Sequence, residues 1–266
     1  MELKQTEILY KSHLYKIEYY IRERSSATIL FLHGLGGAKE NFWWASKYKA
    51  LSKYNLIAFD NPGTGNSTYH NDSLLNIDDL VEITHLFINK IALNNFFLLG
   101  ASMGGLTMLK YITKYGYAKL NGIINIEGNL AEEDCLFSAK VIKYHYQDFC
   151  DIGFQEIVMN MRKNISCGYQ TIANNMELNT NLSSYFNYSF QTVKYSATGE
   201  LLDTFLNLNI PKIFLHGDKN NQLSYIPKLK SEGITVKEIP NSDHFLFYDN
   251  PSILYKNISE FIQQNI

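Results

Sequence analysis

The chain has 266 residues, of which 45% are hydrophobic and 19% charged, and its formal net charge is -2. This balance is typical of a globular protein and argues against an intrinsically disordered chain. A charge so close to zero gives no field that would attract nucleic acid or an anionic membrane, so we expect neither as a partner.

The N-terminal sequence MELKQTEILYKS mixes charged and apolar residues and lacks the apolar segment of a secretory signal. No later run of the sequence reaches the roughly 18 apolar residues that a membrane helix needs. The three cysteines, Cys135, Cys150 and Cys167, have no CxxC spacing, which is typical of reduced thiols. We therefore expect a cytoplasmic protein without a stable membrane association.

The chain opens with two β-rich stretches, at residues 5–9 and 14–21. Apolar residues alternate with polar ones in the second stretch, which favours a half-exposed antiparallel pair. Shorter strands follow, and most are continuous apolar runs of the kind that is covered on both faces of a sheet. These runs are expected at residues 28–32, 55–59, 96–99, 122–126, 212–215 and 235–239.

Segments with helical spacing separate several of these strands, at residues 77–93, 106–115 and 251–262. Strands that alternate with helices predict a mostly parallel, doubly wound sheet of the α/β class. Residues 129–206 break this pattern, because they are rich in aromatic residues and contain helical pieces but no convincing buried strand. We interpret them as a helical cap inserted into a core formed by residues 1–128 and 207–266, with a loop at the asparagine-rich residues 174–181.

The sequence GASMGG around Ser102 follows an apolar strand and precedes a helical segment. A G-x-S-x-G motif in this setting places a serine on a sharp turn with its hydroxyl exposed, and small flanking residues avoid collisions with the neighbouring backbone. The helix N-terminus favours negative charge that develops beside it. Ser102 is therefore the candidate nucleophile.

The sequence LFLHGLGG runs from a strand into a glycine-rich loop that can bring a backbone N–H close to a reacting carbonyl. We expect the N–H groups of Leu35 and Met103 to form a two-donor oxyanion hole. His33 is interpreted as a histidine that holds this loop rather than as a catalytic group. Asp60 and Ser67, in DNPGTGNS, are interpreted as residues that tie a turn with side-chain hydrogen bonds.

His244 lies in NSDHF, after the last strand and before the final helix. A catalytic histidine belongs at this point when the triad runs in the chain order serine, acid, histidine. His216 follows a strand and is interpreted as structural, whereas the other histidines have no motif around them. His244 is therefore the candidate general base.

The motifs HGLGG, DNPGTGNS, GASMGG, IFLHGD and SDHF occur in the order and spacing of the α/β-hydrolase superfamily, which the chain resembles from about residue 28 to its end. The resemblance implies the α/β-hydrolase fold, a mostly parallel doubly wound sheet with a helical cap over the site. It also implies a serine–acid–histidine triad and an oxyanion hole at Leu35 and Met103.

The acid departs from the common pattern of that superfamily. In most members it stands three residues after the glycine that corresponds to Gly217, and this chain has Asn220 there. An amide can orient an imidazole but brings no negative charge to stabilise imidazolium. Glu127 ends the strand of GIINIEG, and the branch that includes haloalkane dehalogenases takes its acid from that strand end. Glu127 is therefore the expected acid, and Asp218 is the alternative.

The dehalogenases and epoxide hydrolases of this superfamily use an aspartate nucleophile, so Ser102 favours acyl transfer to water instead. We expect a serine esterase that cleaves small-molecule carboxylic esters with small to medium apolar acyl groups, and no metal or organic cofactor is implied. Phe42, Trp43 and Trp44 either contribute to an apolar acyl pocket or form the buried face of a first helix. The alternatives to an esterase are a C–C bond hydrolase or a peracid-forming enzyme with the same triad, or a catalytically inactive ligand-binding protein of the same fold.

Overall fold

The computed structural model describes residues 1–24 and 26–266. Over these residues, eight strands form one sheet in the order β1-β2-β4-β3-β5-β6-β7-β8. The strands are β1 (Glu2–Tyr10), β2 (His13–Arg22), β3 (Thr28–Leu32), β4 (Asn55–Phe59), β5 (Phe96–Ala101), β6 (Leu120–Ile126), β7 (Lys212–Gly217) and β8 (Thr235–Ile239). All eight coincide with the strands expected from the sequence to within a few residues at each end.

The pairing follows the expected division of the sheet. β1 pairs with β2 and β2 with β4 in antiparallel fashion, whereas the pairs from β4 through β8 are parallel. The alternating pattern of β2 is explained because one of its faces is buried and the other is partly exposed. The central strand β5 is buried along its whole length, as its continuous apolar sequence predicts.

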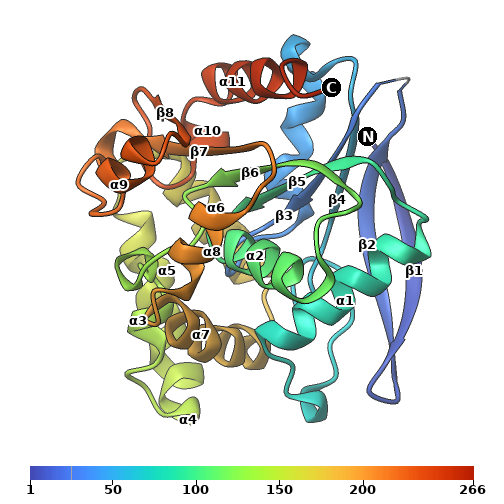
Figure 1. Cartoon of the computed structure of the whole chain (residues 1–266). Helices are drawn as coiled ribbons and strands as arrows, with labels where there is room; N and C mark the ends of the chain where they lie inside the picture. The colour runs from blue at the N-terminus through green and yellow to red at the C-terminus, as the bar shows by residue number, and fades with distance from the viewer. Residues whose placement is uncertain (25) are drawn as a thin grey trace.

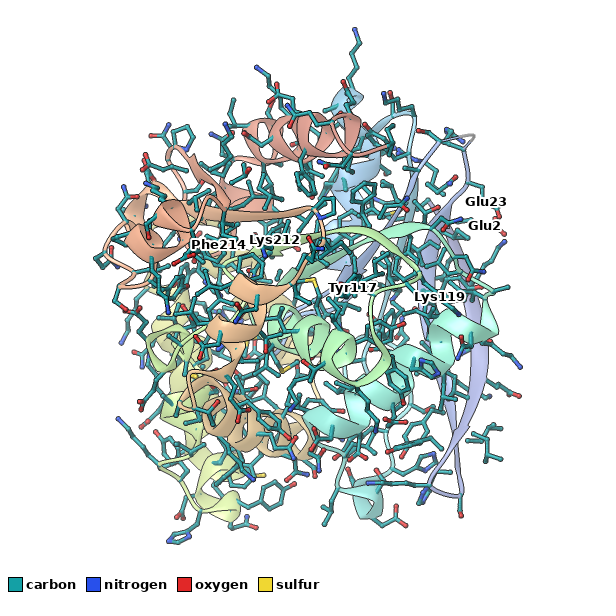
Figure 2. All side chains as sticks on the ribbon, in the orientation of Figure 1. Glu2, Glu23, Tyr117, Lys119, Lys212 and Phe214 are labelled. Carbon is teal, nitrogen blue, oxygen red and sulfur yellow. The ribbon has the colours of Figure 1, made fainter. Side chains whose placement is uncertain are left out.

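Helices cover both faces of the sheet (Figure 1). The helices and single turns of the core are η1 (Lys39–Lys47), η2 (Lys49–Leu51), η3 (Asn71–Ser73), α1 (Ile77–Lys90), α2 (Met103–Tyr115), η6 (Asp218–Asn220), α9 (Ile226–Ser231), α10 (Leu246–Asp249) and α11 (Pro251–Gln263). One hydrophobic cluster joins the sheet to α1, α2 and α9, and a second joins it to η1 and α11. Side chains fill the space between these layers, and Phe214 of β7 is fully buried among them (Figure 2).

The segment between β6 and β7 is helical and lies together at one end of the sheet, in yellow-green to orange (Figure 1). It contains η4 (Glu132–Asp134), α3 (Ser138–Val141), α4 (Tyr146–Asp148), η5 (Phe149–Gly153), α5 (Phe154–Arg162), α6 (Cys167–Asn179), α7 (Leu182–Ser196) and α8 (Glu200–Asn207). Its aromatic residues form a cluster of their own, in which Phe149 contacts Phe154, Tyr185 and Phe186. Phe137 instead faces the ring of His244.

The prediction of a loop at residues 174–181 is wrong, because most of these residues belong to α6. Ile172, Ala173 and Met176 of this helix are buried at helical spacing, and Arg162 of α5 contacts both Asn174 and Glu177 across the helix pair. Packing therefore outweighs the weak helix propensity of the asparagines.

No helix within residues 1–24 and 26–266 is both long and apolar enough to cross a lipid bilayer. The three cysteines are free thiols, as the sequence predicts; Cys135 is buried and Cys167 is exposed.

Candidate active site

Ser102 lies at the turn between β5 and α2, where the backbone is in an uncommon conformation. Its φ of 52° and ψ of -128° lie in a region that residues with a β-carbon rarely adopt. The neighbouring glycines allow the close approach of the two elements: a β-carbon on Gly100 would lie 2.5 Å from the Gly104 carbonyl oxygen. A β-carbon on Gly104 would lie 2.2 Å from the carbonyl oxygen of Leu32 in β3. The turn therefore has the strained, tightly packed geometry that the motif predicts.

The glycine-rich loop after β3 passes directly over this serine. A β-carbon on Gly34 would lie 2.9 Å from the Ser102 β-carbon, so residue 34 must be small for the loop to approach. Leu35 follows in the same loop, and Met103 is the first residue of α2, whose N–H has no partner within the helix. In the described part of the chain, neither N–H donates a hydrogen bond to a protein group. Both are available to an oxyanion.

The loop is held from below by His33, which is fully buried. Its Nε2 accepts the Asn61 N–H at 3.0 Å, and its Nδ1 lies 2.8 Å from the Gly34 carbonyl oxygen. Burial lowers the pKa of His33 to about 4, so the ring is neutral at pH 7. His33 is thus structural, as expected from the sequence. His216 is also buried, and its Nδ1 lies 3.0 Å from the Gly217 carbonyl oxygen.

The buried ammonium group of Lys39, which the sequence does not predict, anchors the end of the same loop. Lys39 is fully buried, and its Nζ lies 2.7 Å from Glu18 and Glu40 and 2.9 Å from Asp60. Asp60 also accepts the backbone N–H groups of Lys39 and Asn66, so it ties the loop to the turn after β4. Lysine is rarely buried, and its partners come from three separate segments, so no local sequence signal identifies it.

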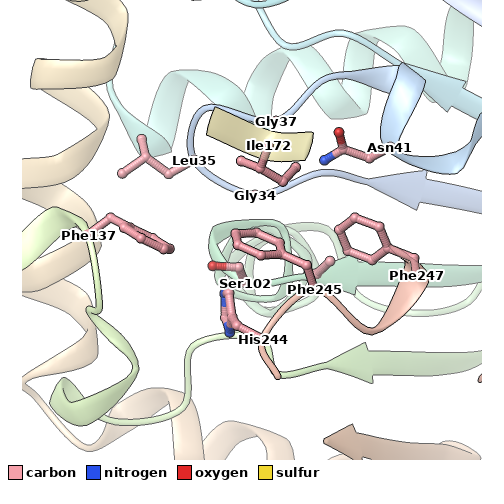
Figure 3. A pocket seen from close by; sticks show the side chains of 11 residues that line it. Gly34, Leu35, Gly37, Asn41, Ser102, Phe137, Ile172, His244, Phe245 and Phe247 are labelled. Atoms are coloured by element: carbon pink, nitrogen blue, oxygen red, sulfur yellow. The ribbon is translucent and has the colours of Figure 1, made fainter. Parts of the chain in front are cut away.

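His244 lies in the loop between β8 and α10, and its ring stands beside the Ser102 side chain (Figure 3). Its Nδ1 lies 2.8 Å from Oε2 of Glu127, and both side chains are buried. Because a carboxylate can only accept, Nδ1 carries the proton, and Nε2 is left free to accept the serine proton. The structure thus brings together Ser102, His244 and Glu127 from three separate segments.

Glu127 stands immediately after β6 with a φ of 39°, another uncommon conformation. Burial raises the pKa of Glu127, but hydrogen bonds from His244, the Gly217 N–H and Asn220 outweigh burial and hold the pKa below its usual value. Asn220 Nδ2 lies 3.0 Å from both Glu127 oxygens. The amide at the position of the common acid therefore donates to the carboxylate on the neighbouring strand.

Asp218, the alternative acid, is directed elsewhere. Its two oxygens accept the N–H groups of Asn241 at 2.8 Å and Ser242 at 2.9 Å. These two backbone hydrogen bonds, led by that of Ser242, lower the pKa of the Asp218 carboxyl group. Asp218 is thus placed to shape the loop that carries His244, and it makes no hydrogen bond to the ring within the described residues.

A narrow apolar pocket opens at Ser102, with about 10 Å³ of space for the centre of a water molecule. Its lining combines residues of the loop after β3 and of the Ser102 turn with side chains of the helical segment between β6 and β7 and of the segment after His244, as Figure 3 shows. The residues are Gly34, Leu35, Gly37, Asn41, Ala101, Ser102, Phe137, Ile172, His244, Phe245 and Phe247. A pocket of this kind can hold a small, mostly apolar group against Ser102.

The aromatic residues Phe42, Trp43 and Trp44 do not line this pocket, so of the two interpretations the acyl pocket is wrong, and the buried helix face holds for Phe42 alone. Phe42 is buried against Phe31 in the core, Trp43 packs on Tyr20, and Trp44 is 55% exposed. The chain there forms a 3-10 helix, whose three residues per turn direct consecutive side chains to three different sides.

A mostly parallel sheet with a serine on a tight turn after its central strand defines the α/β-hydrolase class of fold. A family model described as alpha/beta hydrolase fold matches residues 27–141. The protein named "Putative esterase/lipase 1" of Mycoplasma genitalium is 25% identical over 80% of this chain and 83% of its own length. A protein of the same name from Mycoplasma pneumoniae is 24% identical over 92% of this chain and 93% of its own length.

Solved structures agree with this class. A thermophilic esterase from Thermogutta terrifontis superposes with a TM-score of 0.77 at 15% sequence identity, over 98% of each chain. Residues 27–141 of the chain are thus similar to the alpha/beta hydrolase family, and the chain shares the α/β-hydrolase fold.

Proposed function

We propose that this protein is a serine esterase with Ser102 as nucleophile, His244 as general base and Glu127 as the acid. The observation that carries the proposal is the buried pair of His244 and Glu127, with Nδ1 and Oε2 2.8 Å apart, beside a serine in a strained turn. The names of the two Mycoplasma relatives also support ester hydrolysis.

In the first half of the reaction, His244 Nε2 accepts the Ser102 proton as Oγ attacks the ester carbonyl carbon. The N–H groups of Leu35 and Met103 donate to the resulting oxyanion, and the Glu127 carboxylate stabilises the imidazolium. His244 then gives its proton to the leaving alkoxide, which departs as an alcohol, and an acyl-enzyme remains.

In the second half, water attacks the acyl carbon while His244 accepts a water proton, and the collapse of the intermediate returns that proton to Ser102 Oγ. A hollow of about 160 Å³ reaches His244 beside Glu127 and Asn220 and is a route by which water can arrive. The helical segment 129–206 acts in this proposal as a cap, because its Phe137 and Ile172 close the pocket over the serine.

We assign esters with small to medium apolar acyl groups as the substrate class, since the pocket at Ser102 is small and lined by Phe137, Ile172, Phe245 and Phe247. In a panel of 4-nitrophenyl esters, kcat/KM is expected to be highest for short to medium alkyl chains. A preference for charged acyl groups over alkyl groups of equal size would contradict this assignment.

The nucleophile is tested without knowledge of the natural substrate. Purified protein is incubated with a fluorophosphonate probe, and its intact mass is measured, with Ser102→Ala as the matched control. We expect one adduct on the parent protein and none on the variant. The absence of an adduct on the parent protein, together with no turnover in the ester panel, would refute the esterase and favour a ligand-binding role.

A further inference from the structure

The pocket at Ser102 contains one polar side chain that the proposed mechanism does not use. Asn41 belongs to η1, directly after the oxyanion loop, and is 3% exposed. Its backbone N–H bonds to the Ala38 carbonyl oxygen, but its side-chain amide makes no hydrogen bond to any described residue. A buried amide without partners is costly, and such groups are uncommon in folded proteins.

The surroundings of this amide are apolar on the pocket side. Ile172, Phe245 and Phe247 line the same space as Asn41, and Figure 3 shows the Asn41 amide at one end of it with its nitrogen directed inward. The other polar side chains in the lining are Ser102 and His244, which the reaction already employs.

The backbone beside Asn41 is shaped to admit the amide. A β-carbon on Gly37 would lie 2.5 Å from Asn41 Nδ2, so only glycine at residue 37 leaves this position open. The amide oxygen is fully enclosed, whereas Nδ2 is not among the enclosed unpartnered atoms. The free donor is therefore the group that a molecule in the pocket can reach.

We propose that Asn41 is a specificity-determining residue, whose Nδ2 donates a hydrogen bond to an oxygen acceptor on the substrate chain that fills the apolar pocket. The inference rests on the proposed esterase function and narrows its substrate class to esters whose pocket-bound group is mainly hydrocarbon but carries one ether, carbonyl or hydroxyl oxygen. A plain hydrocarbon chain leaves the donor unpaired, and a site with a buried unpaired group discriminates against such a substrate.

The test uses two series of esters in which one chain methylene at a time is replaced by an ether oxygen. One series varies the acyl chain of 4-nitrophenyl hexanoate, and the other varies the alcohol of hexyl acetate. For each position, kcat/KM of the oxygen ester is divided by that of the hydrocarbon ester, in the parent protein and in Asn41→Leu. The quotient of these two ratios cancels the intrinsic reactivity of each ester.

We expect this quotient to exceed about ten for at least one position of the oxygen. In the parent protein the oxygen ester accepts a hydrogen bond from Asn41, whereas the hydrocarbon ester leaves this donor buried and unpaired. Ile172→Leu changes the same pocket without touching a polar group, so it is expected to alter the oxygen and hydrocarbon esters equally. A quotient within about threefold of one at every position of both series overturns the role of Asn41.

Thermal unfolding separates this role from a structural one. Asn41→Leu removes an unpaired buried amide, so its melting temperature is expected to equal or exceed that of the parent protein. A clear fall in melting temperature without a change in the quotient means that Asn41 is structural. If no ester is hydrolysed faster by the parent protein than by Ser102→Ala, the esterase proposal itself fails, and the inference fails with it.

Discussion

At the scale of single residues, the carboxylate of Glu127 accepts hydrogen bonds from three different groups of the site. It accepts from the Gly217 N–H, the Asn220 amide and the His244 ring while buried between two strand ends. These donors fix the orientation of the carboxylate before any substrate arrives, which is the condition for efficient electrostatic stabilisation.

Glu127→Gln is expected to lower kcat by about 10³- to 10⁴-fold, because an amide can hold the ring but brings no charge to stabilise imidazolium. Asp218→Asn is the matched control: it removes the other candidate carboxylate and is expected to lower kcat less than tenfold. Steady-state hydrolysis of a 4-nitrophenyl ester measures both. Full activity in Glu127→Gln, with a large loss in Asp218→Asn, would reverse the assignment of the acid.

At the scale of elements, the packing of α2 against the sheet determines whether Ser102 keeps its geometry. Gly104→Ala would place a β-carbon 2.2 Å from the Leu32 carbonyl oxygen of β3, and backbone must move to relieve the overlap. We expect a loss of about 3 kcal/mol or more in the free energy of unfolding, measured by urea denaturation.

Gly199→Ala, directly before α8, is the control for this prediction. A β-carbon there meets no atom within 4 Å, although the left-handed backbone, with φ of 79° and ψ of -15°, is unfavourable for alanine. Its cost is expected to be about 1 kcal/mol, from the backbone conformation alone. Equal losses in the two variants would mean that close packing of α2 is not what requires the glycine.

The elements also show how far local sequence patterns extend. Continuous apolar runs predicted the strands, because a strand that is buried on both faces needs apolar residues at consecutive positions. The turn of Ser102 was predictable because a strand, two glycines and a helix follow one another within a few residues. Lys39 and Asn41 were not, since their burial depends on segments distant in the chain. The helix α6 was missed because its burial comes from α5 and α10 rather than from its own propensity.

At the scale of the whole molecule, the helical segment between β6 and β7 is joined to the rest of the chain through hydrogen bonds near the site. Asp249 of α10 accepts from Ser166 and Gly168 at the start of α6, and it also accepts the Asp243 N–H in the loop of His244. Tyr188 of α7 donates to the Pro62 carbonyl oxygen in the turn after β4. The segment over the pocket is thus tied to the loop that carries His244.

The contribution of His33 to the stability of the whole protein is expected to fall in mild acid. Its pKa is about 4 in the folded protein and near 6.5 when unfolded, so the unfolded chain takes up the proton first. The contribution of a neutral, buried His33 is complete above pH 6.5 and decreases as the pH falls toward 4. We expect about 2 kcal/mol of unfolding free energy to be lost between pH 7 and pH 5 through this group.

Chemical denaturation at a series of pH values measures this loss, and His33→Gln, which cannot titrate, provides the comparison. The variant is expected to be less stable at pH 7, and its deficit in unfolding free energy relative to the parent protein is expected to shrink by about 2 kcal/mol between pH 7 and pH 5. If the two proteins lose the same amount, His33 is not the group responsible.

The contact between Asn220 and Glu127 has a consequence for how such a site can change over generations. The two side chains come from neighbouring strand ends, and the Asn220 amide donates to the carboxylate that holds the His244 ring. Asparagine and aspartate codons differ by a single nucleotide, as do glutamine and glutamate codons. Two point mutations can therefore move the negative charge from one strand end to the next, and the intermediate holds either two carboxyl groups in contact, which share a proton, or none.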